Sequence, residues 1–202
     1  AIELQEAFLS GQQGVQLVGA WMRLGHLYTV QGRPADASEA FASEVRFLEG
    51  IDHALRSRIR VELSMRRGAA FLALGNREQA ESAFAFGLDA FAHRVTLGAD
   101  EPFTRYYAAG IHALRGEREE ALDLLENAVA ASPPFVIARA RIEPEWDGVR
   151  DEPRFRRLVG EWEGGVEGGG EHGGRASSGG AGESADATAE RARGGREADV
   201  LE

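Results

Sequence analysis

The amino-acid sequence predicts an all-α protein in which antiparallel helix pairs follow one another along the chain. Apolar residues recur at the i, i+3, i+4 and i+7 spacing of one helix face, as at Ala121, Leu124, Leu125 and Ala128. No segment combines the apolar–polar alternation of a strand with an enrichment in β-branched residues. Glycine and proline turn signals separate the helical stretches at regular intervals, which indicates a repeated helical unit.

The composition changes near Trp162 and divides the chain into two parts. Residues 1–162 carry the helical pattern, whereas residues 163–202 consist mainly of Gly, Glu, Ala, Ser and Arg. A segment with so few large apolar side chains cannot bury enough surface to offset the entropy lost on ordering. We therefore expect one helical domain over residues 1–162 and a disordered tail over residues 163–202.

Charge and composition exclude several classes of function. The 202-residue chain has a formal net charge of -10, which argues against nucleic acid as a partner because phosphate binding requires clustered basic residues. No apolar run approaches the roughly 20 residues of a membrane span, so we expect no membrane insertion. Cysteine is absent, which excludes disulfide scaffolds and thiolate metal sites and is typical of a reducing compartment. We expect a cytoplasmic location.

The beginning of the chain predicts a piece of a longer protein. The first residue is Ala1 rather than Met, and Ile2, Leu4, Phe8 and Leu9 have the apolar spacing of a helix end. We expect this helix to belong to a repeat that continues upstream. A domain upstream on the same polypeptide is then one partner to consider.

The segment from Trp21 to Phe41 carries the most regular copy of the repeated unit. It fits the pattern W-x2-L-G-x2-Y followed by A-x3-F through Trp21, Leu24, Gly25, Tyr28, Ala37 and Phe41, with Gly32 at the turn. This arrangement resembles the tetratricopeptide repeat. A weaker copy contains Gly68, Phe71, Gly75, Ala80 and Phe84, and a third contains Ala109, Gly116, Ala121, Leu125, Ala128 and Pro133. The resemblance covers residues 14–132 and implies an α-solenoid of about three repeats followed by capping helices.

The copies are longer than the standard repeat. The turn glycines Gly32, Gly75 and Gly116 lie 43 and 41 residues apart, against about 34 in the standard unit. We expect the extra length in longer helices around the loops at residues 49–53 and 98–100.

Two glycines in the middle of predicted helices indicate close helix packing. Glycine in a helix interior costs about 1 kcal/mol relative to alanine, so Gly25 and Gly68 suggest that a neighbouring helix needs the space. On the second helix of each pair, a small residue followed four positions later by a large one would complete the contact. These residues are Ala37 with Phe41, Ala80 with Phe84, and Ala121 with Leu125. The alternative is ordinary amphipathic packing in an unrelated helical bundle.

The region after the third copy predicts a cap. Residues 134–142 read as a further helix, and Asp151 can cap another helix that starts near Pro153. Trp146, Phe155 and Leu158 would then cover the end of the stack, since the last layer of a solenoid must be sealed. A similar segment often closes tetratricopeptide arrays in bacterial multidomain signalling proteins.

Catalytic and metal-binding signals are weak. Glu143, Glu145, Asp147 and Gly148 imitate the start of a calcium loop, but Arg154 stands where the loop needs its last glutamate, so the cap interpretation is preferred. The histidines form no H-E-x-x-H motif and no pair at i, i+4. Nucleophile motifs, a Walker A sequence and a dinucleotide fingerprint are also missing. We expect no enzyme activity, no metal and no cofactor.

The family resemblance implies a groove lined by the first helix of each pair. The aligned positions are Met22, His26, Met65, Arg66, Phe103, Tyr106 and Tyr107. This apolar and aromatic set with one guanidinium favours a helix or an extended apolar peptide as the ligand. It does not fit the Lys and Asn clamp with which some family members hold a C-terminal carboxylate. The alternative is that several of these side chains pack against neighbouring helices.

These observations favour a non-catalytic protein-interaction scaffold that binds a peptide or helix of a partner protein. The alternative function is a regulatory or sensory segment at the C-terminal end of a bacterial Ser/Thr protein kinase, cyclase or transcriptional regulator. The sequence does not identify the partner.

Overall fold

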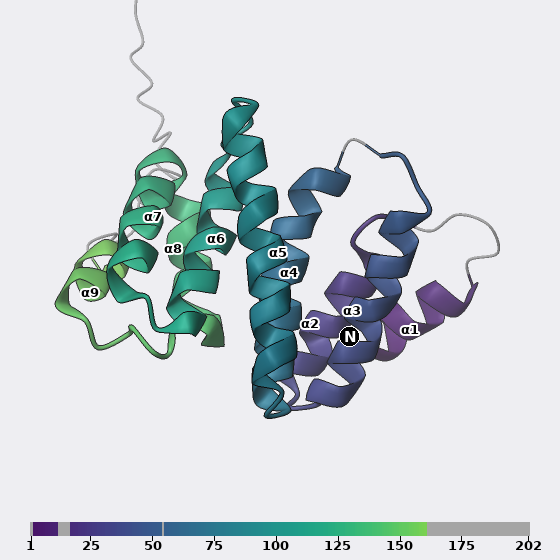
Figure 1. Ribbon diagram of the computed structural model, residues 1–202. Coiled ribbons are helices and arrows are strands. Elements are labelled where there is room, and N and C mark those ends of the chain that lie inside the picture. Colours follow the sequence, from purple (N-terminus) through teal and green to yellow (C-terminus); the bar gives the residue numbers. More distant parts are fainter. Residues whose placement is uncertain (1, 12–16, 54, 161–202) are drawn as a thin grey trace, which may run out of the picture. The chain divides into compact units, whose positions relative to one another are not determined.

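The computed structural model describes residues 2–11, 17–53 and 55–160, and this part of the chain is helical (Figure 1). Its elements are α1 (Ile2–Gly11), α2 (Ala20–Val30), α3 (Pro34–Glu49), α4 (Arg56–Ala73), α5 (Arg77–Thr96), α6 (Pro102–Arg115), α7 (Arg118–Ala131), α8 (Pro133–Ile142), the 3₁₀ helix η1 (Pro144–Trp146) and α9 (Pro153–Gly160). These residues contain no strand, which confirms the predicted all-α class. None of the helices is both long and apolar enough to cross a bilayer. The predicted tail, residues 163–202, lies outside the described residues.

Three consecutive helix pairs make up most of the described part. The most extensive helix contacts are those of α2 with α3, α4 with α5, and α6 with α7. Neighbouring pairs also touch, since α4 packs on both α3 and α6, and Figure 1 shows the pairs side by side in chain order. The turn inside each pair contains a glycine with positive φ, at Gly32, Gly75 and Gly116, as the turn signals predicted. The long spacing of these turns reflects long helices, with 18 residues in α4 and 20 in α5.

The paired helices approach each other most closely at the two mid-helix glycines. A Cβ atom on Gly25 would lie 2.4 Å from the ring of Phe41, and one on Gly68 would lie 2.1 Å from the ring of Phe84. Both rings are fully buried, so the predicted reason for these glycines is confirmed. In the third pair, Ala109 takes the glycine position and the smaller Leu125 replaces the phenylalanine, and both are fully buried.

The apolar core consists of two clusters that meet at α4. Leu63 and Ala70 of α4 join the cluster formed by α1, α2 and α3. Val61 and Met65 of the same helix join the larger cluster that extends through α5 to α9. Because α4 presents buried residues to both sides, it connects the N-terminal and C-terminal halves of the described domain.

A buried carboxylate links the first pair. Glu44 of α3 is fully buried, and its two oxygens accept hydrogen bonds from the backbone N–H groups of Gly19, at 2.7 Å, and Met22, at 3.2 Å. The first N–H groups of a helix lack intrahelical acceptors, and the helix dipole favours negative charge at that end. Glu44 therefore caps α2, whose own N-cap residue is a glycine with no side chain to do so.

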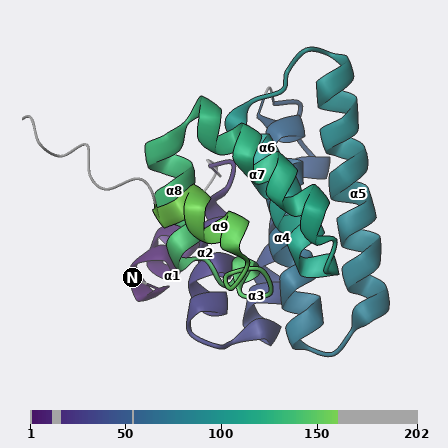
Figure 2. The ribbon, with the colours of Figure 1, turned by 90° about the vertical axis from the view of Figure 1, so that its left-hand side faces the viewer.

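The C-terminal elements cover the last pair, as predicted. Figure 2 shows α9 on the side turned toward the viewer, and α9 contacts both α7 and α8. Trp146 is fully buried, with its ring centroid 5.5 Å from that of Tyr106 and 5.7 Å from that of Phe155. The helix predicted near Pro153 begins there. The carboxylate of Asp151, expected to cap it, instead accepts a hydrogen bond from Arg156 Nη2 at 2.6 Å.

We predict that Gly68→Ala lowers the free energy of unfolding by about 2 kcal/mol. Alanine alone would favour the helix by about 1 kcal/mol, but its Cβ must displace the Phe84 ring in a packed core, which costs more. Urea unfolding measures the difference. Gly50→Ala is the matched control, because a Cβ there meets nothing closer than 3.6 Å. If Gly68→Ala were more stable than the wild type, close packing of Phe84 on Gly68 would not be what requires glycine at this position.

Candidate partner-binding groove

The seven side chains predicted to line a groove lie on the first helices of the three pairs, but they separate into two groups. Met22, His26 and Arg66 line a common cavity of about 330 Å³ between α2 and α4. Met65, Phe103, Tyr106 and Tyr107 lie instead in the core formed with the elements after α7, fully or partly buried. The structure thus brings three of the predicted residues together at an open site.

In the second group, Phe103 and Tyr106 are covered by α8 and η1. Tyr106 is fully buried, and its ring packs against Trp146. Phe103 packs edge-on against Phe135 of α8, with the ring centroids 4.2 Å apart. These two side chains therefore pack against neighbouring elements, as the alternative interpretation stated. The chain's own C-terminal segment occupies the half of the predicted groove that lies over α6.

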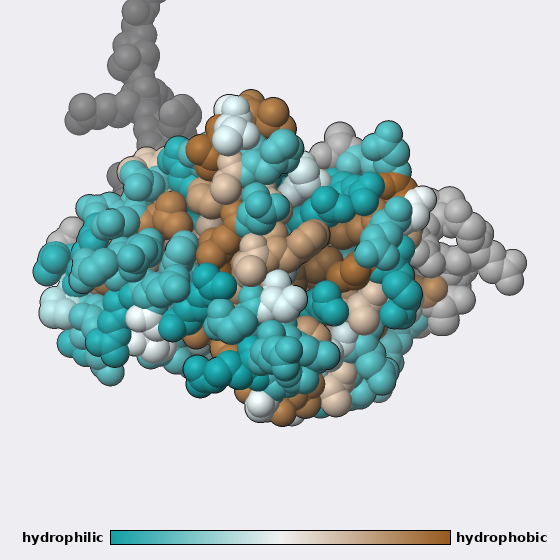
Figure 3. Space-filling view, in the orientation of Figure 1, coloured by the Kyte–Doolittle hydropathy of each residue, from teal (hydrophilic) through white to brown (hydrophobic). Residues whose placement is uncertain are grey.

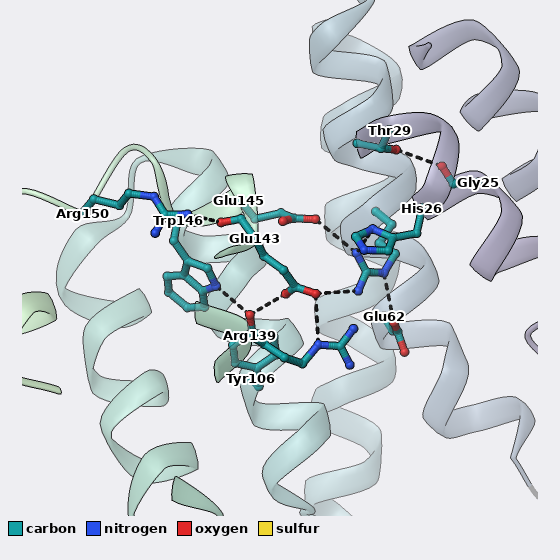
Figure 4. Close-up of polar contacts among 11 residues, drawn as sticks. Gly25, His26, Thr29, Glu62, Tyr106, Arg139, Glu143, Glu145, Trp146 and Arg150 are labelled. Carbon is teal, nitrogen blue, oxygen red and sulfur yellow. Dashed lines mark hydrogen bonds and ion pairs between the residues drawn. The ribbon is translucent and has the colours of Figure 1, made fainter. Parts of the chain in front are cut away.

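The guanidinium of Arg66 is the centre of the polar contacts that hold this segment. Its partners His26, Glu62, Glu143 and Glu145 are labelled in Figure 4. Only 2% of the side chain is exposed. Nε pairs with Glu62 at 2.9 Å, and Nη2 pairs with Glu143 at 3.0 Å. Nη1 lies 3.4 Å from Glu145 and 2.8 Å from Nδ1 of His26. One buried cation on α4 therefore joins α2 to the residues around η1.

Glu143 extends this network toward α6 and α8. Its Oε1 also accepts a hydrogen bond from Arg139 Nε at 3.0 Å, and its Oε2 accepts one from the hydroxyl of Tyr106 at 2.5 Å. That hydroxyl in turn accepts the indole N–H of Trp146 at 2.9 Å. The backbone carbonyl of Glu143 accepts a hydrogen bond from Arg150 Nη2 at 2.6 Å. The segment is thus held by both charged and neutral hydrogen bonds, which explains its buried position.

The two buried carboxylates of this segment have opposite pKa shifts. Burial alone would raise the pKa of Glu143, but Arg66, the Tyr106 hydroxyl and Arg139 outweigh burial and hold the pKa below its ordinary value. For Glu145, burial dominates the attraction of Arg66, and neighbouring Glu143 adds to it, so the pKa is raised. Its Oε2 is buried without a hydrogen-bond partner. Glu145 is therefore the weaker of the two anchors.

His26 is a neutral hydrogen-bond partner of Arg66. Burial, followed by the repulsion of Arg66, lowers the pKa of His26 to about 4, so the ring is uncharged at neutral pH. A guanidinium can only donate hydrogen bonds, so Nδ1 of His26 must accept the one from Arg66 Nη1. The single proton of the neutral ring then sits on Nε2. His26 contributes one N–H donor to its surroundings.

The open cavity combines an apolar wall with polar nitrogen groups. Its lining residues are Gln5, Met22, Arg23, His26, Leu27, Glu62, Arg66 and Arg139. Met22 and Leu27 supply the apolar side chains, and Glu62 is the carboxylate in the lining. Glu62, Arg139, Glu143 and Glu145 were absent from the predicted groove residues. The pairs Glu62–Arg66 and Arg139–Glu143 have an i, i+4 spacing that the sequence displays, whereas the acidic partners of Arg66 beyond α4, Glu143 and Glu145, lie 77 and 79 residues away.

A second cavity, of about 380 Å³, lies between α3 and α5 with α4 as its floor. Figure 3 shows apolar residues gathered in this central region of an otherwise mostly hydrophilic face. Its apolar lining includes Val45, Leu63, Phe71 and Phe86. None of the predicted groove residues lines it.

Among the residues that the structure describes, no cluster of His, Cys, Asp and Glu could hold a metal ion.

Comparison with known proteins gives no match to a family model, to a curated protein or to a solved structure. The fold and the open cavity are therefore the observations that bear on function.

We predict that Arg66→Met lowers the free energy of unfolding by about 3–5 kcal/mol. The variant leaves Glu62, Glu143 and Glu145 close together without their shared cation, and an unpaired buried charge is strongly destabilising. Urea unfolding at pH 7 measures the effect. Arg77→Met, which removes an exposed arginine, should change stability by less than about 0.5 kcal/mol. Adding Glu143→Gln and Glu145→Gln to Arg66→Met should recover part of the loss. A variant as stable as the wild type would contradict the central role of Arg66.

We predict that His26 makes the domain less stable in acid. Its pKa is about 4 in the folded protein against 6.5 in the unfolded chain, so between these pH values the unfolded chain binds more protons. The free energy of unfolding must then fall as the pH falls through this window. Allowing for the partial exposure of the ring, the loss is about 1–2 kcal/mol.

The test compares wild type with His26→Gln by urea unfolding at pH 7 and pH 4. Glutamine can still accept the hydrogen bond from Arg66 but does not titrate, so the variant should lose about 1–2 kcal/mol less than the wild type over this range. The control is His93→Gln, at an exposed position of α5, which should keep the wild-type pH dependence. Equal losses in wild type and His26→Gln would show that His26 is not the group responsible.

Proposed function

We propose that this chain is a non-catalytic protein-interaction domain, built as a tetratricopeptide-like α-solenoid of three helix pairs, that binds a peptide segment of a partner protein. The shared packing of the pairs supports the solenoid: in the first two pairs a glycine on the first helix faces a phenylalanine on the second, and the matching positions of the third pair are also fully buried. The contacts are Gly25 with Phe41 and Gly68 with Phe84, and the matching positions are Ala109 and Leu125.

The observation that carries the proposal is the cavity between α2 and α4. It contains three of the residues that the family resemblance assigns to a ligand-binding groove, namely Met22, His26 and Arg66. Its volume of about 330 Å³ can hold one or two side chains of a peptide, and its polar groups can fix their orientation. The predicted groove residues on α6 are covered by the chain's own C-terminal segment, so we propose that the partner binds at α2 and α4.

A binding role fits the chemistry beside the cavity better than a catalytic one. The Arg66 guanidinium is engaged with Glu62, Glu143 and Glu145, which supports a structural use of these charges. His26 accepts a hydrogen bond from Arg66 and has a pKa of about 4, too low for a general base at neutral pH. We assign the protein to the cytoplasm on its lack of cysteine.

A peptide-array screen followed by methionine NMR tests this function. The chain contains two methionines, of which Met22 lines the cavity and Met65 is buried in the larger core cluster, with its side chain against Gly110 of α6. With ¹³C-labelled methyl groups, a peptide selected on the array should shift the Met22 signal in a saturable way and leave the Met65 signal unchanged. A Met22→Leu variant assigns the two signals. If the array retains no peptide, or if retained peptides leave Met22 unaffected, this function is wrong.

A further inference from the structure

The cavity presents several N–H groups that have no acceptor in the part of the chain that the structure describes. Arg23 is exposed on α2 and forms no ion pair or hydrogen bond there through its guanidinium. Arg139 uses Nε for Glu143 but neither Nη atom, and its side chain is 29% exposed. His26 adds the N–H of Nε2, since Nδ1 accepts from Arg66. Three side chains from two different helices thus offer donors at one site.

The carboxylate in the lining does not satisfy these donors. Glu62 is 17% exposed, and the bond formed by its Oε1 goes to the buried Arg66. Glu143 and Glu145 are buried and do not line the cavity; both pair with Arg66, and Glu143 also pairs with Arg139 Nε. The lining therefore holds three guanidinium groups against one carboxylate, although the whole chain carries a net charge of -10. Because Arg66 and Arg139 are already paired with buried glutamates, the unpaired charge at the site is that of Arg23. Together with the free N–H groups of Arg139 and His26, it favours an anionic group.

The geometry points to a binding site for an aspartate or glutamate side chain of the partner peptide, flanked by apolar residues. The carboxylate would accept hydrogen bonds from Arg23, Arg139 and His26, and charge-assisted bonds of this kind are among the strongest in proteins. The apolar neighbours would pack on Met22 and Leu27. A single negative charge suits the site better than a phosphate dianion, because Glu62 lies in the same lining. This inference rests on the proposed function and names the chemistry of its ligand.

Four short peptides test the inference, with the Met22 methyl signal as the readout. Three have acetylated and amidated ends and a central Leu-Glu-Leu, Leu-Gln-Leu or Leu-Lys-Leu, and the fourth is the glutamine peptide with a free C-terminal carboxylate. We expect the glutamate peptide to bind at least ten times more tightly than the blocked glutamine peptide, and the lysine peptide to bind most weakly. The free-carboxylate peptide should bind no more tightly than the glutamate peptide.

Matched protein variants locate the site. Arg23→Gln should weaken binding of the glutamate peptide five- to tenfold, whereas Arg77→Gln, which removes the same charge from an exposed position on α5, should leave it unchanged. Raising the salt concentration should weaken binding of the glutamate peptide more than binding of the glutamine peptide, because salt ions screen the attraction between charges.

The outcomes separate this inference from the proposed function. Equal affinity for the glutamate and glutamine peptides, or binding of none of the four, overturns the acidic-ligand assignment. The proposed function survives either result if array-selected peptides still shift Met22. Tighter binding of the free-carboxylate peptide would assign the donors to a chain terminus instead of a side chain. If the array also yields no peptide that reaches Met22, both conclusions fall together.

Discussion

The buried guanidinium of Arg66 is the interaction on which the arrangement of the domain depends. It lies on α4, the helix whose buried residues belong to both apolar clusters, and it contacts α2 through His26 and the η1 region through Glu143 and Glu145. Burying a cation is unfavourable unless anions and acceptors compensate for the lost hydration. The same requirement that stabilises Arg66 therefore fixes where the C-terminal segment must lie.

The apolar packing sets the framework within which these charges meet. Phe41 and Phe84 fill the space left by Gly25 and Gly68, so the two helices of a pair can approach closely enough to exclude water. Such contacts fix the spacing within a pair, but they repeat from pair to pair and do not determine how the series ends. The polar network around Arg66 occurs once among the described residues, and it gives the last elements a unique position.

Local features of the sequence predicted the helices, their turns and the close glycine–phenylalanine contacts, because each depends on residues within one pair. The cap was predicted for the same reason, since Trp146 and Phe155 are large apolar residues beside short helices. The sequence could not predict that the C-terminal segment also contacts α4. The contacts of Arg66 with Glu143 and Glu145 span 77 and 79 residues, and helical periodicity says nothing about pairings at such separations. The hydrogen bond from the Gly19 N–H to Glu44, at the N-terminus of α2, was missed for the same reason.

The position of the cap changes the chemistry of the surface left for a partner. The predicted groove was aromatic because Phe103, Tyr106 and Tyr107 were counted as exposed. Phe103 and Tyr106 instead pack against Phe135 and Trp146, and the buried Tyr107 ring packs against Tyr106. Once they are covered, the open lining consists mainly of α2 and α4 side chains with Arg139 added by the cap itself. The segment that removes the aromatic surface thus supplies a basic group to what remains. A ligand chosen by this surface must satisfy nitrogen donors first and apolar contacts second, since unpaired buried donors are more costly than lost apolar area of similar size.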